Sequence, residues 1–127
     1  GLPPMNMFEG KIQGGYFKSD LFEYPLSEKQ IRQLKDYEGK EVILGVRPEN
    51  VTRDGSVKLN VTNNENLGMN TLVHGKVGGV KNVVCKFAEW CNYKNGDDIN
   101  IGFDATMMHF FEMPEGDMPG KAIIKEG

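Results

Sequence analysis

The chain has 127 residues, a formal net charge of −3 and a sequence pI of about 5.4. This length fits one ordinary domain, and 39% hydrophobic with 26% charged residues is typical of a globular chain, not a disordered one. The sequence has no Lys/Arg run that would mark a nucleic-acid or anionic-membrane surface, no apolar run near the roughly 18 residues of a membrane span, and no signal-peptide pattern. We therefore expect a soluble protein in a reducing compartment.

The first strand is predicted at residues 7–12, and Gly14-Gly15 is a turn that leads into residues 16–18. A helical insertion is predicted at about 26–38. Its start is marked by Ser27, whose spacing to Gln30 is that of a capping box. Gly39 closes the helix, and the apolar stripe that would face the rest of the fold consists of Ile31, Leu34 and Tyr37.

The second half of the chain reads as short strands separated by turns. Alternation with period two is clearest in residues 57–62, which indicates a half-buried antiparallel strand. The other expected strands are residues 42–46, 71–77, 83–87 and 99–103, and the expected turns are 53–56, 78–79 and 95–98. Five or more such strands with one short surface helix predict a mainly β fold, a small antiparallel barrel of the OB type, with a sandwich as the alternative.

The strand at residues 42–46 ends abruptly at Arg47-Pro48-Glu49. Proline removes a backbone donor and pushes Arg47 out of helical geometry. The two opposite charges suit a catalytic couple, a partner-binding corner or a salt-bridged bend. We favour a structural bend, because no nucleophile or second carboxylate cluster lies nearby in the sequence.

No catalytic motif is present. The stretch from Gly116 to Ala122 is one residue too short between its glycines for a phosphate-binding loop, and Ala122 stands where Ser or Thr should hold magnesium. His74 and His109 lack neighbouring metal ligands, and Cys85 and Cys91 have neither redox nor zinc spacing, so we expect two free thiols. The sequence predicts no catalytic, cofactor-binding or metal residues.

Several segments together resemble the C-terminal regulatory region of the ATP-binding subunits of sugar-importing ABC transporters, of the maltose-importer type. LGVRPENV is similar to the LGxRPEx signature of that family, and further segments occur on both sides of it in the family's order. These are Pro3–Phe8 (PxMNF), residues 26–34 with 39–42 (the helical insertion), Asn64–Met69 (a turn with Gly68), His109–Glu112 (the closing motif) and Gly120–Ile123 (its end). Two departures are Glu112 in place of the usual Asp and a longer closing turn at residues 113–119.

The resemblance implies an OB-like barrel called TOBE. It implies that residues 1–127 are a single regulatory β domain, in which Arg47, Pro48, Glu49 and Gly68 are structural motif positions. This chain would not be an enzyme. ATP and Mg would be bound only by a nucleotide-binding domain that is missing here, in a full-length ATPase that drives sugar import at the inner face of the cell membrane.

The partners implied by the resemblance are a second copy of the chain, the nucleotide-binding domain of the same polypeptide, the membrane permease subunits indirectly, and a sugar-phosphotransferase regulator. Nucleic acid is not among them. An apolar cluster near the C-terminus supplies candidate contacts, of which we expect at least one phenylalanine to face a partner. The cluster consists of Met107, Met108, Phe110 and Phe111.

Two other functions suit an OB-type fold. One is a free-standing module for a small oxyanion, for which the sequence shows no compact motif. The other is single-stranded nucleic-acid binding, which needs basic and aromatic residues along one groove. Those residue types occur at Lys76, Lys81, Lys86 and Lys94 and at Phe87, Trp90 and Tyr93, but acidic residues interrupt them throughout.

Overall fold

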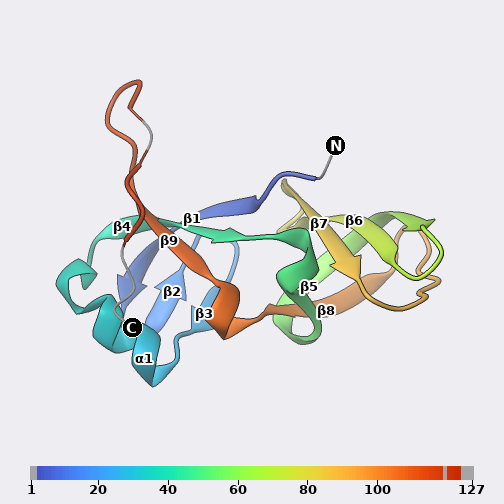
Figure 1. Ribbon diagram of the computed structural model, residues 1–127, viewed down its shortest axis with the longest axis horizontal. Coiled ribbons are helices and arrows are strands. Elements are labelled where there is room, and N and C mark those ends of the chain that lie inside the picture. The colour runs from blue at the N-terminus through green and yellow to red at the C-terminus, as the bar shows by residue number, and fades with distance from the viewer. Residues whose placement is uncertain (1–2, 119, 124–127) are drawn as a thin grey trace. The chain divides into compact units, whose positions relative to one another are not determined.

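The computed structural model describes residues 3–118 and 120–123 of the chain. The strands form two antiparallel sheets, and α1 (Glu28–Gln33) is a short helix (Figure 1). The predicted mainly β fold class is therefore confirmed. The chain divides into two compact units: unit 1 contains Gly1–Asn6 and Val46–Met107, and unit 2 contains Met7–Gly45 and Met108–Gly127. Within the described residues, no helix has the length and apolar character needed to cross a membrane.

Unit 1 is built on a four-stranded sheet with the order β7-β6-β5-β8. Its strands are β5 (Val51–Asn66), β6 (Thr71–Val77), β7 (Lys81–Phe87) and β8 (Asp98–Phe103), and its 3-10 turns are η2 (Pro48–Asn50) and η3 (Ala105–Met107). Alternate residues point into the core because side chains of a strand project to opposite faces. The largest fully buried side chains of this unit are Leu59, Ile101, Val46, Val57, Val61, Val73, Val77 and Val83.

The prediction of a turn at residues 53–56 is wrong. β5 runs without interruption from Val51 to Asn66, and its pairing with β8 shifts register between Thr52 and Val57. Asp54-Gly55 therefore lies in an irregular stretch of a long strand, not in a hairpin. The glycine is needed for close approach, since a Cβ on Gly55 would overlap the carbonyl oxygen of Ile101 and lie 2.5 Å from the Cα of Gly102.

Unit 2 carries most of the five-stranded sheet, which has the order β3-β2-β1-β4-β9. The strands are β1 (Asn6–Gln13), β2 (Tyr16–Lys18), β3 (Glu23–Pro25), β4 (Glu41–Val46) and β9 (His109–Glu112). The aromatic rings of Phe17 and Phe110 meet at 6.3 Å in its core, and Phe8 stacks edge-on with Phe22 at 5.2 Å. Residues after the closing turn pair with β9, because the Ile123 amide donates to the Phe110 carbonyl at 2.8 Å.

The predicted capping box is confirmed. The amide of Gln30 donates to the hydroxyl of Ser27 at 3.1 Å, and the amide of Ser27 donates to the side-chain oxygen of Gln30 at 2.8 Å. The helix is shorter than expected, since α1 ends at Gln33 and continues as the 3-10 turn η1 (Lys35–Tyr37). Gly39 then adopts the left-handed conformation expected of a closing glycine, with φ 77°.

The apolar stripe predicted on this helix is only partly buried. Leu34 is 2% exposed, whereas Ile31 is 43% exposed. Gln30, which precedes Ile31, is also buried, and its side-chain nitrogen lies 3.4 Å from the sulfur of Met108. A polar residue is accommodated there because its oxygen serves the capping box while its nitrogen contacts the thioether.

Candidate functional site

The signature turn at Arg47-Pro48-Glu49 is a structural corner of unit 1. Arg47 is extended, with φ −69° and ψ 149°, so the predicted effect of Pro48 on the preceding residue is confirmed. Pro48 is buried at the start of η2, which packs against β7, and the Asn50 amide donates to the Arg47 carbonyl at 2.9 Å. Arg47 and Glu49 are exposed on either side.

Asn6 fastens the start of the chain to the edge of β7 within unit 1. Its side-chain oxygen accepts from the Val84 amide at 2.9 Å, and its side-chain nitrogen donates to the carbonyls of Val84 at 2.9 Å and Val46 at 3.1 Å. The side chain thus satisfies the edge of the sheet as a neighbouring strand would. Asn6 was present in the PxMNF resemblance, but nothing in the single sequence assigned it this contact.

Arg53 organises the loop that follows β7. Its guanidinium lies 2.7 Å from the carboxylate of Glu89 and donates to the hydroxyl of Tyr93 at 3.0 Å, contacts that raise the pKa of Arg53. The same group lies 5.9 Å from the ring centroid of Phe87 and 5.7 Å from that of Tyr93. Two of the three aromatic side chains considered for nucleic-acid stacking are therefore not available: Phe87 is buried and Tyr93 is engaged by Arg53.

Thr71 of β6 and Asn64 of β5 hold the same loop through hydrogen bonds to its backbone. The Thr71 hydroxyl lies 2.8 Å from the carbonyl oxygen of Glu89 and accepts from the Cys91 amide at 3.0 Å. The Asn64 side chain donates to the Cys91 carbonyl at 3.0 Å and accepts from the Tyr93 amide at 3.1 Å. Residues 89–93 form no strand or helix, so these hydrogen bonds fix their backbone.

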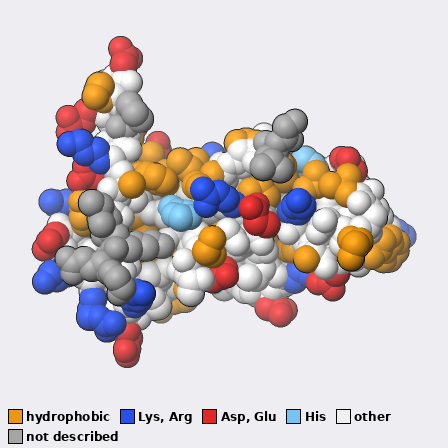
Figure 2. Space-filling view, viewed as in Figure 1, with side chains coloured by type: hydrophobic (Ala, Val, Ile, Leu, Met, Phe, Trp, Pro, Cys, Tyr) orange, Lys and Arg blue, Asp and Glu red, His pale blue; other side chains and the backbone are white. Residues whose placement is uncertain are grey.

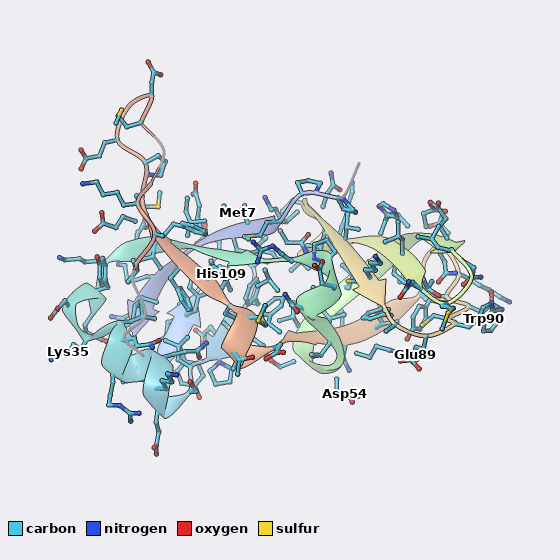
Figure 3. The ribbon with its side chains drawn as sticks, viewed as in Figure 1. Met7, Lys35, Asp54, Glu89, Trp90 and His109 are labelled. Carbon is cyan, nitrogen blue, oxygen red and sulfur yellow. The ribbon has the colours of Figure 1, made fainter. Side chains whose placement is uncertain are left out.

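This fixed loop presents an exposed tryptophan. Trp90 is 64% exposed, and the turn between β5 and β6 adds Met69 at 86% and Leu67 at 48%. Both segments meet at Thr71, which contacts Asn66 beside the turn as well as the loop. Figure 2 shows hydrophobic side chains at this end of unit 1, where Figure 3 labels Trp90.

The C-terminal residues proposed as partner contacts differ in burial. Met108 is 0% and Phe110 3% exposed, and both lie in unit 2. They are core residues there because buried and partly exposed positions alternate from Met108, just before β9, to Phe111. Phe111 is half-buried on the opposite face, directly across from Ile43 of β4, while Met107 in unit 1 is 36% exposed.

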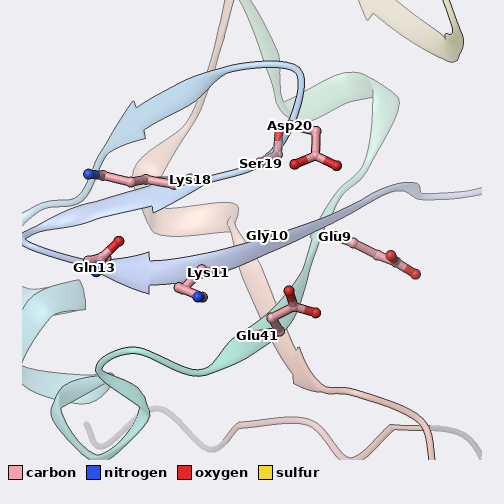
Figure 4. Close-up of a pocket in the computed structure, with 8 residues that line it drawn as sticks. All are labelled: Glu9, Gly10, Lys11, Gln13, Lys18, Ser19, Asp20 and Glu41. Carbon is pink, nitrogen blue, oxygen red and sulfur yellow. The ribbon is translucent and has the colours of Figure 1, made fainter.

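A shallow polar pocket of about 300 Å³ lies on unit 2 (Figure 4). Lys11 of β1 and Lys18 of β2 are directly paired across the strands there, and carboxylates surround them. The lining residues are Glu9, Gly10, Lys11, Gln13, Lys18, Ser19, Asp20 and Glu41. The pocket has charges of both signs and no aromatic wall, so its lining does not select one ligand class.

The remaining candidate groups of the sequence lie apart from these surfaces. Cys85 and Cys91 are free and buried, and burial raises the pKa of the Cys85 thiol to about 12. His74 and His109 are half-buried, and no group of three or more possible metal ligands occurs among the residues that the structure describes. In the closing turn, Glu115 pairs with Met118 and Gly116 has φ 58°, whereas Pro119 lies outside the described residues.

Gly68 occupies the turn between β5 and β6 with φ 88°, a conformation that favours glycine. Its neighbours Leu67 and Asn70 close the turn through a backbone hydrogen bond of 2.8 Å. The motif glycine therefore shapes the same turn that exposes Met69.

Comparison with known proteins places these features in a family. A family model described as the MalK OB fold domain matches residues 1–51, and one described as the TOBE domain matches residues 44–111. The oligosaccharides import ATP-binding protein MsmX of Bacillus subtilis (strain 168) is 28% identical over 123 residues, covering 88% of this chain and 33% of that protein. The trehalose/maltose import ATP-binding protein MalK of Thermococcus litoralis is 31% identical over 129 residues, covering 91% and 34%.

The xylose/arabinose import ATP-binding protein XacK of Haloferax volcanii is 31% identical over 128 residues, covering 92% of this chain and 32% of that protein. The chain thus spans about a third of the length of the curated relatives it matches. The resemblance found in the sequence is confirmed. Since the TOBE model matches residues 44–111 of the 127, which is more than half, this chain belongs to the TOBE domain family.

Proposed function

We propose that this chain is the regulatory domain of the ATP-binding subunit of a carbohydrate importer. The carrying observation is the extent of the alignments: import ATP-binding proteins match about nine-tenths of this chain but only a third of their own length. The rest of such a subunit would contain the nucleotide-binding domain, with its ATP and Mg. This domain would work at the cytoplasmic face of the membrane, next to the permease subunits.

The domain's action is to hold two ATP-binding subunits together while their nucleotide domains open and close. A tether of this kind requires surface contacts rather than catalytic groups. Fixed, exposed apolar side chains at one end of unit 1 support that role. A sugar-phosphotransferase regulator would bind a further surface of the same domain.

Sedimentation equilibrium over a wide concentration range tests the tether, with ATP and Mg in a parallel cell. We expect a reversible dimer whose dissociation constant ATP leaves unchanged. A monomer at every concentration would overturn self-association by this domain. An ATP-dependent change would overturn the assignment of ATP binding to a separate domain.

A further inference from the structure

The outward face of unit 1 carries a row of three side chains with opposite charges at its ends. Lys86 of β7 pairs in register with Leu72 of β6, and Leu72 pairs with Glu65 of β5. All three project away from the core, since their neighbours Val73 and Cys85 are fully buried and sides alternate along a strand. Among the described residues, neither Lys86 nor Glu65 has an ion-pair partner.

This row is complementary to its own image. Two copies can pack with these faces against each other, related by a two-fold axis that runs between them, parallel to the strands, and passes by Leu72. This axis places Lys86 of one copy against Glu65 of the other. The same operation places Glu65 against Lys86, so both ends of the row are paired at once. Leu72 meets its own counterpart at the centre. Adjacent strands are about 4.8 Å apart, so the two charges of one copy are roughly 10 Å apart and do not neutralise each other.

Apolar side chains continue this face toward the turn between β5 and β6. Leu67 and Met69 lie in that turn, a few residues from Glu65 and Leu72. The loop with Trp90 is held by Thr71 and Asn64, whose side chains point to the opposite face of the sheet, so Trp90 is not part of this face. Met and Leu side chains bury a large area when they dock. We define the hairpin-end surface as Glu65, Leu67, Met69, Leu72 and Lys86.

We propose that the hairpin-end surface binds the same surface of a second copy across a two-fold axis, with Lys86 and Glu65 forming reciprocal intermolecular ion pairs. This inference rests on the proposed self-association and names its contact surface. A second copy is the favoured occupant because the row carries one charge of each sign in the order that its own image requires. The neighbouring Arg53 and Glu89 already pair with each other at 2.7 Å, so neither of these two groups is left to attract a charged partner.

Reversal of single charges tests whether the hairpin-end surface forms the dimer contact. Lys86→Glu places two carboxylates at each end of the row, and Glu65→Lys places two ammonium groups there. We expect each variant to raise the dimer dissociation constant by roughly tenfold or more, because facing like charges repel. The double variant K86E/E65K restores opposite charges and is expected to return to within about threefold of the wild-type value. Lys58→Glu, an exposed charge reversal elsewhere on β5, is the control for net charge.

Mixing the two single variants gives the sharper measurement. One partner then carries Glu at both positions and the other carries Lys at both, so only the mixed dimer is complementary. We expect the K86E and E65K chains to form a heterodimer more tightly than either forms a homodimer. Sedimentation with one chain fluorescently labelled measures this, and the gain should shrink at high salt.

The outcomes separate the two proposals. Dimerisation of the wild type that neither reversal weakens would overturn the hairpin-end surface and leave self-association standing. A wild type that stays monomeric would overturn both. Met69→Ser and Val80→Ser form a matched pair, because Val80 is 71% exposed in the turn at the opposite end of β6. Only M69S is expected to weaken the dimer, and equal weakening by both would also contradict the assignment.

Discussion

Single side chains fix the position of irregular backbone in this protein. Asn6 makes three hydrogen bonds to Val84 and Val46, and it replaces a strand that the edge of β7 lacks. Thr71 and Asn64 do the same for the loop that carries Trp90. In each case a short polar side chain satisfies backbone groups that would otherwise be buried without partners.

Replacement of Asn6 with Ala should lower the free energy of unfolding by about 2–4 kcal/mol, since it leaves backbone groups of Val84 and Val46 without partners. Urea unfolding followed by circular dichroism measures the change. Asn82→Ala, at an exposed position on β7, should change stability by less than about 0.5 kcal/mol. Equal effects of the two substitutions would contradict the role assigned to Asn6.

Cys85 predicts a dependence of stability on alkaline pH. Burial raises its pKa from 9.0 to about 12, so the folded chain retains a thiol proton that the unfolded chain loses above pH 9. The stabilisation is complete below the unfolded pKa and is lost as pH rises from 9 toward 12, with a slope of at most about 1.4 kcal/mol per pH unit.

Comparison of the wild type with Cys85→Val isolates this titration. Between pH 8 and 10.5, the wild-type free energy of unfolding should fall more steeply than that of the variant. The measurement is urea unfolding at several pH values under reducing conditions. Parallel pH profiles would show that the buried thiol does not titrate differently in the two states.

At the scale of elements, β5 decides the architecture of unit 1. It is long enough to pair with β6 and β8, and it crosses Asp54-Gly55, where local sequence predicts a turn. The irregularity is local: register against β8 shifts between Thr52 and Val57 while the strand continues. Pairing with β8 overrides turn propensity because the whole strand gains cross-strand contacts.

Gly55→Ala tests this close approach. An added Cβ would overlap the Ile101 carbonyl oxygen, which belongs to rigid backbone, so we expect a loss of about 2 kcal/mol or more in unfolding free energy. Ser56→Ala at the next exposed position is the control. If Gly55 instead lay in an open turn, the two substitutions would have similar effects.

The helical insertion shows the same dependence on surroundings. Ser27 and Gln30 close the capping box locally, yet Tyr37 of η1 is fixed by a long-range hydrogen bond of 2.7 Å to Glu112 of β9. This bond raises the pKa of the Tyr37 phenol. The carboxylate of Glu112 thus connects the helical insertion to β9 within unit 2.

At the scale of the whole molecule, the adjacent residues Phe110 and Phe111 differ in burial, so their substitution should affect stability differently. Phe110→Ser should lower the free energy of unfolding by about 3–5 kcal/mol, because Phe110 is 3% exposed against Phe17. Phe111→Ser should lower it by much less, since its side chain is half-buried. Thermal and urea unfolding of both variants measure the contrast, and comparable losses would contradict it.

The same variants address the partner role predicted for Phe111. If Phe111 contacts a second copy, F111S raises the dimer dissociation constant without a matching loss of stability. An unchanged dissociation constant would show that Phe111 is not part of the dimer contact. Sedimentation equilibrium of F111S beside K86E distinguishes the two surfaces.

The sequence by itself determined the features that depend on near neighbours in the chain. Period-two alternation predicted the half-buried strand at residues 57–62, Pro48 ended its strand, and Ser27 with Gln30 began the helix. The ordered motifs also identified the family, because motif spacing is retained when most other residues differ.

Only the tertiary structure decided which side chains are surface and which are core. It buried Met108 and Phe110, continued β5 through Gly55, and aligned Lys86, Leu72 and Glu65 in one row. The reason is that strand register joins residues far apart in sequence, and no local pattern specifies which residue of one strand will lie opposite which residue of the next.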